Sequence, residues 1–80
     1  MLYAEITEKI IKSAINVYNT LGFGFAEKVY ENSLLIEIEL FGLKAIQQHP
    51  IKVYYEEKVV GDYIADIVVE DKIIVELKSI

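Results

Sequence analysis

The sequence predicts an α+β domain in which two N-terminal helices pack on an antiparallel β-meander of three or more strands. In the first half of the chain, apolar residues recur at three- and four-residue spacing, which is typical of amphipathic helices. After Gly42 the pattern changes to the apolar runs and two-residue period of strands. A chain of 80 residues has room for one small domain. We therefore expect one domain over residues 1–80, with the helices in 4–41 and the sheet in 43–79.

The first helix is expected from about Ile6 to Leu21, because Gly22 is a natural stop. The second is expected from about Ala26 to Phe41, where Gly42 closes it. The apolar faces predicted for the two helices are Ile6, Ile10, Ala14, Val17, Tyr18 and Leu21 in the first, and Val29, Tyr30, Leu34, Ile38 and Phe41 in the second.

Strands are expected next at 43–48 and 51–55. Pro50 lies between them and lacks an amide donor, which implies an edge position or a bulge at that point. A turn at 56–58 reverses the chain, and Gly61 bends or bulges the strand that follows.

The last two strands are expected at 63–69 and 73–78, joined by the three residues 70–72. A three-residue loop pairs Val69 with Ile73. One face of this hairpin is then wholly apolar, and it requires a cover that only the two helices can provide.

Three charged residues, Asp66, Glu76 and Lys78, interrupt these apolar strands. The three-residue loop places Asp66 opposite Glu76, with Lys78 on the same face. Directly opposed carboxylates repel, so the arrangement is costly unless a cation or a shared proton compensates. A divalent metal does so and leaves room for a water beside Lys78. A two-residue turn at 70–71 would instead pair Asp66 with Val75 and move Glu76 to the other face. We favour the three-residue loop because it keeps the acids off the apolar face.

The composition limits the classes of function. The chain has 13 acidic residues against eight lysines, with no arginine, and a formal net charge of −5, which disfavours a simple phosphate-binding surface. It has no cysteine for disulfides or thiolate metal sites. We find no signal peptide and no apolar run that spans a membrane, so we expect a cytoplasmic protein without a membrane partner. With 54% hydrophobic residues, a homo-oligomer is also expected.

The start of the second helix carries Glu27 and, one turn later, Glu31. Glu27 in the first turn gains from the positive end of the helix. One of these acids reaches the acidic cluster of the sheet if the helix packs across it, whereas Glu31 is expected on a solvated face. Tyr30 is expected to pack with its hydroxyl bonded to a partner, and Gly24 to serve the backbone before the helix.

These residues carry a resemblance to a known family. Gly24, Glu27 and Tyr30 match the motif that names the GxxExxY family, and the segment from Asp66 to Lys78 matches its second block. That family is similar to the PD-(D/E)XK nuclease-like superfamily. The resemblance runs from the first helix to Lys78, and two blocks in the right order are more specific than either block alone.

The resemblance implies a metal-dependent nuclease that hydrolyses phosphodiesters of nucleic acid with Mg²⁺ or Mn²⁺. It implies Asp66 and Glu76 as catalytic metal ligands, with the Leu77 carbonyl as a further ligand. Lys78 is implied as the catalytic residue that orients or activates the attacking water, and Glu27 as an additional acid of the metal site.

Members of the family usually continue past this lysine into another helix and a further strand, whereas this sequence ends at Ser79 and Ile80. We therefore expect a restriction-endonuclease-like core that lacks its last helix and strand, and an inactive domain is one outcome of that difference. The alternative function is a non-enzymatic homo-oligomeric interaction module, in which the open edge 73–80 pairs with another chain.

Overall fold

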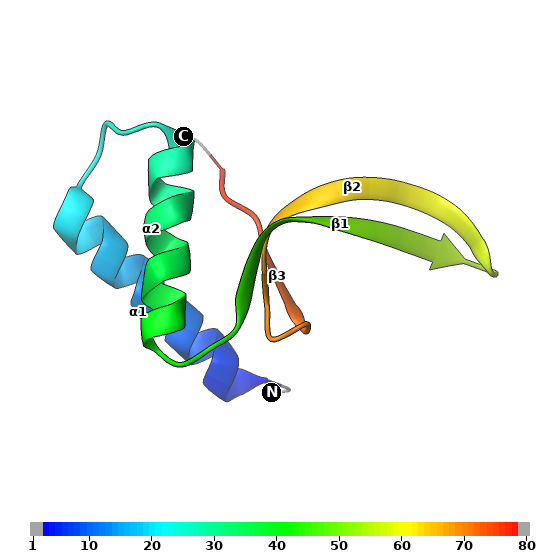
Figure 1. Ribbon diagram of the computed structural model, residues 1–80, viewed down its shortest axis with the longest axis horizontal. Coiled ribbons are helices and arrows are strands. Elements are labelled where there is room, and N and C mark those ends of the chain that lie inside the picture. The colour runs from blue at the N-terminus through cyan, green and yellow to red at the C-terminus, as the bar shows by residue number, and fades with distance from the viewer. Residues whose placement is uncertain (1–2, 79–80) are drawn as a thin grey trace.

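In the computed structural model, which describes residues 3–78, two helices are followed by a three-stranded antiparallel sheet (Figure 1). The α+β class predicted from the sequence is confirmed. The helices are α1 (Ala4–Leu21) and α2 (Glu27–Leu40), and the strands, in the order β1-β2-β3, are β1 (Ala45–Tyr55), β2 (Lys58–Val69) and β3 (Ile73–Val75).

Helix α1 follows the predicted periodicity, with Ile10 and Val17 buried. The face also includes Ser13, which is fully buried and donates a hydrogen bond from Oγ to the Lys9 carbonyl at 2.8 Å. This bond satisfies the hydroxyl inside the core. The prediction for Tyr18 on the buried face is wrong, since its side chain is 45% exposed near the connection between the two helices.

Helix α2 buries Leu34 and Ile38, as its spacing predicts. The prediction for Val29 is wrong, since its side chain is exposed. The helix ends at Leu40 with Phe41 as its C-cap. Gly42 follows with a φ of 83°, a left-handed conformation that glycine adopts without steric cost.

Strand β1 is continuous where two separate strands were expected. Pro50 lies within it, and this is possible because β1 is an edge strand whose outer amides have no neighbour. The edge position predicted for Pro50 is confirmed. The irregularity lies further along, between Val53 and Tyr54, where the register with β2 shifts next to Gly61. The bulge predicted at Gly61 is therefore confirmed.

The β2–β3 hairpin has the predicted three-residue loop. Val69 pairs with Ile73 and Ile67 pairs with Val75, so the register favoured from the sequence is confirmed over its length. Strand β3 stops at Val75, short of the strand expected through Lys78. The sheet was also expected to reach Ser79, which lies outside the described residues.

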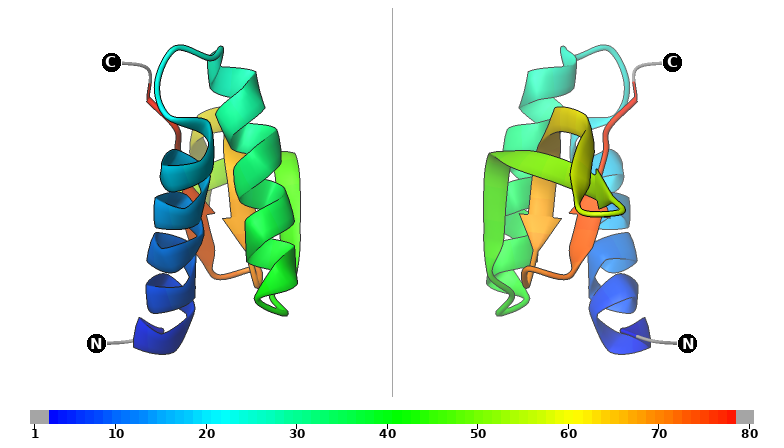
Figure 2. Two further views of the ribbon diagram at one scale, coloured as in Figure 1. Left: turned by 90° about the vertical axis from the view of Figure 1, so that its left-hand side faces the viewer. Right: turned by 90° about the vertical axis from the view of Figure 1, so that its right-hand side faces the viewer.

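Both helices cover the same face of the sheet (Figure 2). The core between them contains Ile67 and Val69 of β2, both fully buried, with Leu34 and Ile38 of α2 packed in the same cluster. The helices cover the sheet only near β3, and the rest of the β1–β2 hairpin extends past them (Figure 1). Of the helices in the described residues, none combines the length and the apolar character that crossing a membrane requires.

Candidate active site

A side chain–backbone hydrogen bond joins β2 to the segment that follows β3. The Leu77 N–H donates to the Asp66 carboxylate at 2.7 Å, and Asp66 is half-buried. Backbone pairing between the strands has ended by this point, because β3 stops at Val75. The cross-strand pair predicted between Asp66 and Glu76 is therefore replaced by a contact of the Asp66 side chain with the backbone N–H of Leu77.

A cavity of about 480 Å³ lies beside this segment. It is bounded by the connection between the two helices and by the chain after β3, so residues far apart in the sequence line one space. Glu27, Glu76 and Lys78 are the charged residues among those that line it. The full lining is Ala14, Val17, Tyr18, Phe23, Gly24, Phe25, Glu27, Tyr30, Leu34, Val75, Glu76, Leu77 and Lys78.

The helix connection that forms one wall is held by Tyr30. Its hydroxyl donates to the Gly22 carbonyl at 2.5 Å and accepts a longer bond from the Phe25 N–H at 3.4 Å. The ring also packs against Tyr18, with centroids 6.1 Å apart. The packing role and the hydroxyl partner predicted for Tyr30 are confirmed.

Gly24 has a φ of 103°, a backbone conformation that residues with a side chain rarely adopt. The predicted backbone role of this glycine is therefore confirmed as well. The turn at Gly24 brings the chain to the start of α2, where Glu27 occupies the first helical turn and is exposed at the cavity. Glu27 thereby lines the same cavity as the chain that follows β3.

Glu31 does not lie on a solvated face, as the sequence suggested. It is only 3% exposed, because α2 packs this residue against β1. Its carboxylate accepts hydrogen bonds from Lys28 at 2.9 Å, from Gln47 at 2.7 Å and from Gln48 at 3.1 Å. The spacing of acids along α2 could not reveal this environment, although the adjacent amides of Gln47 and Gln48 in a strand were a signal of it.

Burial acts to raise the pKa of Glu31, but its partners outweigh burial. Hydrogen bonds from Lys28, Gln47 and Gln48, together with the positive charge of Lys28, bring the pKa below its ordinary value. Glu31 is therefore an ionised carboxylate that links α2 to β1. Gln48 has a φ of 51°, so β1 departs from regular strand geometry between the pair of Gln47 with Ile67 and the pair of His49 with Ala65.

The predicted metal ligands are brought together in part. Glu27, Glu76 and Leu77 line one cavity, and Asp66 contacts the backbone of Leu77. Within residues 3–78, no three side chains of the histidine, aspartate and glutamate types are grouped closely enough to hold a metal ion. The donors are carboxylate and carbonyl oxygens, which in kind suit a hard cation such as Mg²⁺. Lys78 lines the same cavity.

Comparison with protein-family models gives a match over nearly the whole chain. The family model described as the PD-(D/E)XK nuclease superfamily matches residues 4–80. Searches of curated proteins and of solved structures gave no match.

Proposed function

Because the chain belongs to the PD-(D/E)XK nuclease superfamily, we propose that it is a metal-dependent nuclease-like domain that hydrolyses phosphodiester bonds of nucleic acid. The observation that carries the proposal is the 2.7 Å hydrogen bond from the Leu77 N–H to Asp66. It fixes one predicted ligand next to the segment that holds the other two site residues, Glu76 and Lys78. The motif residues Gly24, Glu27 and Tyr30 support the finer assignment to the GxxExxY family.

The metal site proposed here consists of Asp66, Glu76, the Leu77 carbonyl and Glu27. The Asp66 carboxylate has two oxygens, so it can keep the bond from the Leu77 N–H and still offer an oxygen to a cation. Glu27 and Glu76 line one cavity from opposite elements. Bound there, Mg²⁺ or Mn²⁺ would supply Lewis-acid stabilisation of the phosphoryl group and an activated water.

Lys78 acts on the attacking water and the phosphate in this proposal. Its ammonium group donates hydrogen bonds only, so it orients the water through the oxygen lone pairs and stabilises negative charge on the phosphoryl oxygens. The water oxygen bonds to phosphorus as the bond to the leaving oxygen breaks, and the proton of the water passes to the leaving side or to solvent. Nucleic acid is the partner that this chemistry requires.

The first test is calorimetric titration of Mn²⁺ into the protein and into an Asp66→Asn/Glu76→Gln double variant. The amide oxygen introduced by Asp66→Asn keeps an acceptor for the Leu77 N–H, so the variant removes charge without removing that hydrogen bond. We expect saturable binding in the original chain and a loss of affinity of about 100-fold or more in the variant, because two anionic ligands are lost.

An Asp62→Asn/Glu57→Gln variant is the matched control. It removes two exposed carboxylates of the β1–β2 hairpin, and thus changes the net charge equally, far from the cavity. Equal affinity in all three proteins, or no binding in any of them, contradicts the proposed metal site. Cleavage of oligonucleotides in Mn²⁺, lost in the site variant and kept in the control, is the corresponding test of activity.

A further inference from the structure

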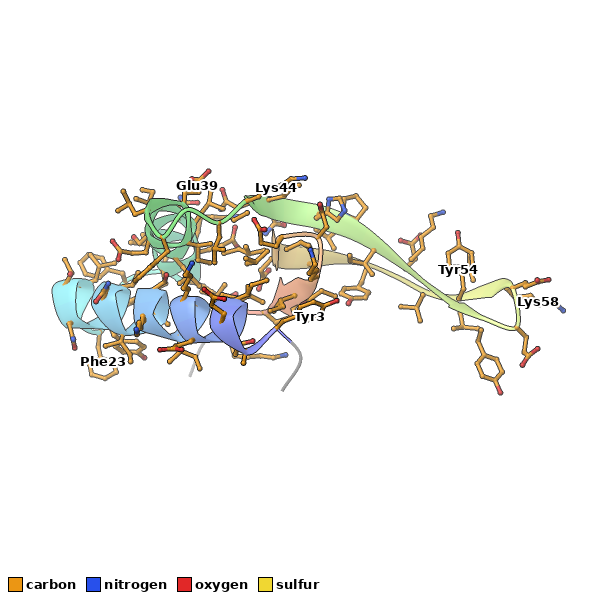
Figure 3. All side chains as sticks on the ribbon, turned by 90° about the horizontal axis from the view of Figure 1, so that it is seen from below. Tyr3, Phe23, Glu39, Lys44, Tyr54 and Lys58 are labelled. Atoms are coloured by element: carbon orange, nitrogen blue, oxygen red, sulfur yellow. The ribbon has the colours of Figure 1, made fainter. Side chains whose placement is uncertain are left out.

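The β1–β2 hairpin forms an arm, residues 49–65, that extends beyond the two helices. Figure 3 shows Tyr54 and Lys58 at its far end, away from the helix pair. Apolar side chains along it are exposed where a single domain would ordinarily bury them. Those that exceed one third exposure are Val53, Tyr54, Tyr55, Val59, Val60, Tyr63 and Ile64.

The two faces of the arm differ in charge. Lys52 pairs with Asp62 across the strands, so one face carries a charged pair at its centre. On the other face Ile51 pairs with Tyr63 and Val53 pairs with Gly61, and no charged residue lies between these pairs. We call this second face the core-side face, because Ala65 and the core residues of β2 continue it toward the helices.

The core-side face carries no side chain at Gly61, where an added Cβ atom would lie 3.5 Å from Val53, in ordinary contact. Tyr55 extends the apolar surface toward the tip on the same side as Val53, two residues away. Lys58, which pairs with Tyr55, is the charged residue that the structure describes at this end of the face.

We propose that the core-side face of the arm binds the same face of a second copy of this chain, as two sheets that pack face to face about a two-fold axis. Tyr55 is 68% exposed, Val53 is 43% exposed and Tyr63 is 41% exposed. Together they offer roughly 300 Å² of apolar surface.

An interface is a little over half apolar, so this apolar area corresponds to about 1,000 Å² of total buried surface for the pair. That area is at the lower limit for a specific interface, and it fits a weak dimer of two arms.

Charge also favours a second copy as the partner. The arm has two lysines, Lys52 and Lys58, and three acids, Glu56, Glu57 and Asp62. Its net charge of −1 therefore permits two arms to approach, although the whole chain carries −5. A nucleic acid would be repelled by the acidic tip, so the phosphate backbone is not the partner of this face. The dimer is independent of the proposed metal site.

Sedimentation velocity over about 1 to 200 μM tests the dimer, because weak association falls in this range. We expect the original chain to shift from monomer toward dimer. Tyr55→Lys should raise the dissociation constant about tenfold or more, since it replaces the most exposed aromatic ring of the contact by a charge. Tyr63→Lys, on the partner strand of the same face, should have the same effect.

Tyr54→Lys is the matched control for Tyr55→Lys. Tyr54 directly precedes Tyr55 in β1, is similarly exposed at 61% and points to the opposite face. It should leave the dissociation constant within about twofold. A monomer at every concentration overturns the proposal. So does an equal effect of Tyr54→Lys and Tyr55→Lys, which would indicate contact through the other face or through strand edges. Circular dichroism of each variant verifies that the helices and the core remain folded.

Discussion

At the scale of single residues, Glu31 links parts of the chain that the sequence keeps 16 residues apart. Its carboxylate accepts bonds from Gln47 of β1 while Lys28 of its own helix supplies a positive charge. Buried polar groups without partners destabilise a fold, whereas this one has three donors around it. Glu31 therefore stabilises the contact between α2 and β1 in its ionised form.

The pH dependence of stability follows from the lowered pKa of Glu31. A carboxyl whose pKa is lower in the folded state stabilises the fold above its unfolded value, and this contribution is lost as the pH falls through the folded value. We predict that Glu31→Gln lowers the free energy of unfolding by about 2 kcal/mol at pH 7. The difference between the two proteins should start to shrink below about pH 4.5, where the carboxyl of the unfolded chain takes up a proton, and it should vanish at the lower pH at which the folded carboxyl is protonated. Urea unfolding at pH 7, 5, 4 and 3 measures it.

Glu8→Gln provides the control for this prediction. Glu8 pairs with Lys12 at 3.2 Å on the surface of α1, and its side chain is 65% exposed. Its loss should change stability by less than about 0.5 kcal/mol at every pH. A Glu31 difference that stays constant from pH 7 to pH 3 would show that the carboxylate charge has no part in the contact.

A second residue-scale prediction concerns Tyr30. Tyr30→Phe removes the hydroxyl that donates to the Gly22 carbonyl and should cost about 1 kcal/mol. In a domain of this size that corresponds to a fall in Tm of about 4–8 °C. Tyr18→Phe is the matched variant, because the hydroxyl of Tyr18 makes no hydrogen bond within residues 3–78, and its Tm should not change. Equal Tm values for the two variants would contradict the role of the Tyr30 hydroxyl.

At the scale of elements, the tip of the arm is a two-residue turn built from unfavourable residues. Glu56 and Glu57 have φ values of 50° and 65°. A residue with a Cβ atom adopts such positive φ values only at a steric cost. This is the backbone of a hairpin turn for which Asn-Gly is the preferred pair. The steric cost at Glu56 and Glu57 therefore lowers the stability of the closed hairpin turn.

Replacement of the tip by Glu56→Asn/Glu57→Gly should favour the closed arm by about 1 kcal/mol, because asparagine and glycine accept positive φ. Amide hydrogen exchange at the tip, measured for Tyr55 and Lys58, should slow about fivefold. Glu56→Ala/Glu57→Ala removes the same charges but keeps the Cβ atoms, and it should give no slowing. Equal slowing in both variants would assign the effect to charge and not to backbone conformation.

Some elements were predictable and others were not, for physical reasons that differ. Periodicity located both helices because each buries one face against the sheet. The loop at 70–72 was also predictable, because an alternative register would mix acids into the apolar face. Pro50 misled the prediction, since an edge strand passes through proline without losing a ladder bond. The early end of β3 at Val75 is followed by a side chain–backbone contact, from the Leu77 N–H to Asp66, that no pattern of strand residues encodes.

At the scale of the whole molecule, the two helices cover only part of the sheet, and this explains why the apolar side chains of the arm are exposed. The two helices pack over the part of the sheet near β3, and the molecule measures 44 Å along its longest axis because the arm continues past them. The sequence contains enough apolar residues for this surface, but composition does not state where they lie. Self-association was an expectation from composition and stays a prediction, whereas the choice of the arm as its proposed location required the structure.

The candidate site was predictable to a similar extent. Residue types and their order named Asp66, Glu76 and Lys78, and these were enough to predict oxygen ligands for a hard cation. The burial of Glu31 and the shared cavity of Glu27 and Lys78 depend on how α2 lies against the chain after β3. Such distances between elements arise from packing, and local spacing does not specify them.

The contact between Asp66 and Leu77 couples the chemistry of the candidate site to the backbone that follows β3. One carboxylate accepts the hydrogen bond that holds this segment and is also the proposed ligand for a cation. The segment that carries Glu76 and Lys78 is therefore anchored to β2 through the same side chain that the proposed site requires. A change at Asp66 alters the path of this backbone and the composition of the proposed site together, so the two effects of such a change cannot be separated by one substitution.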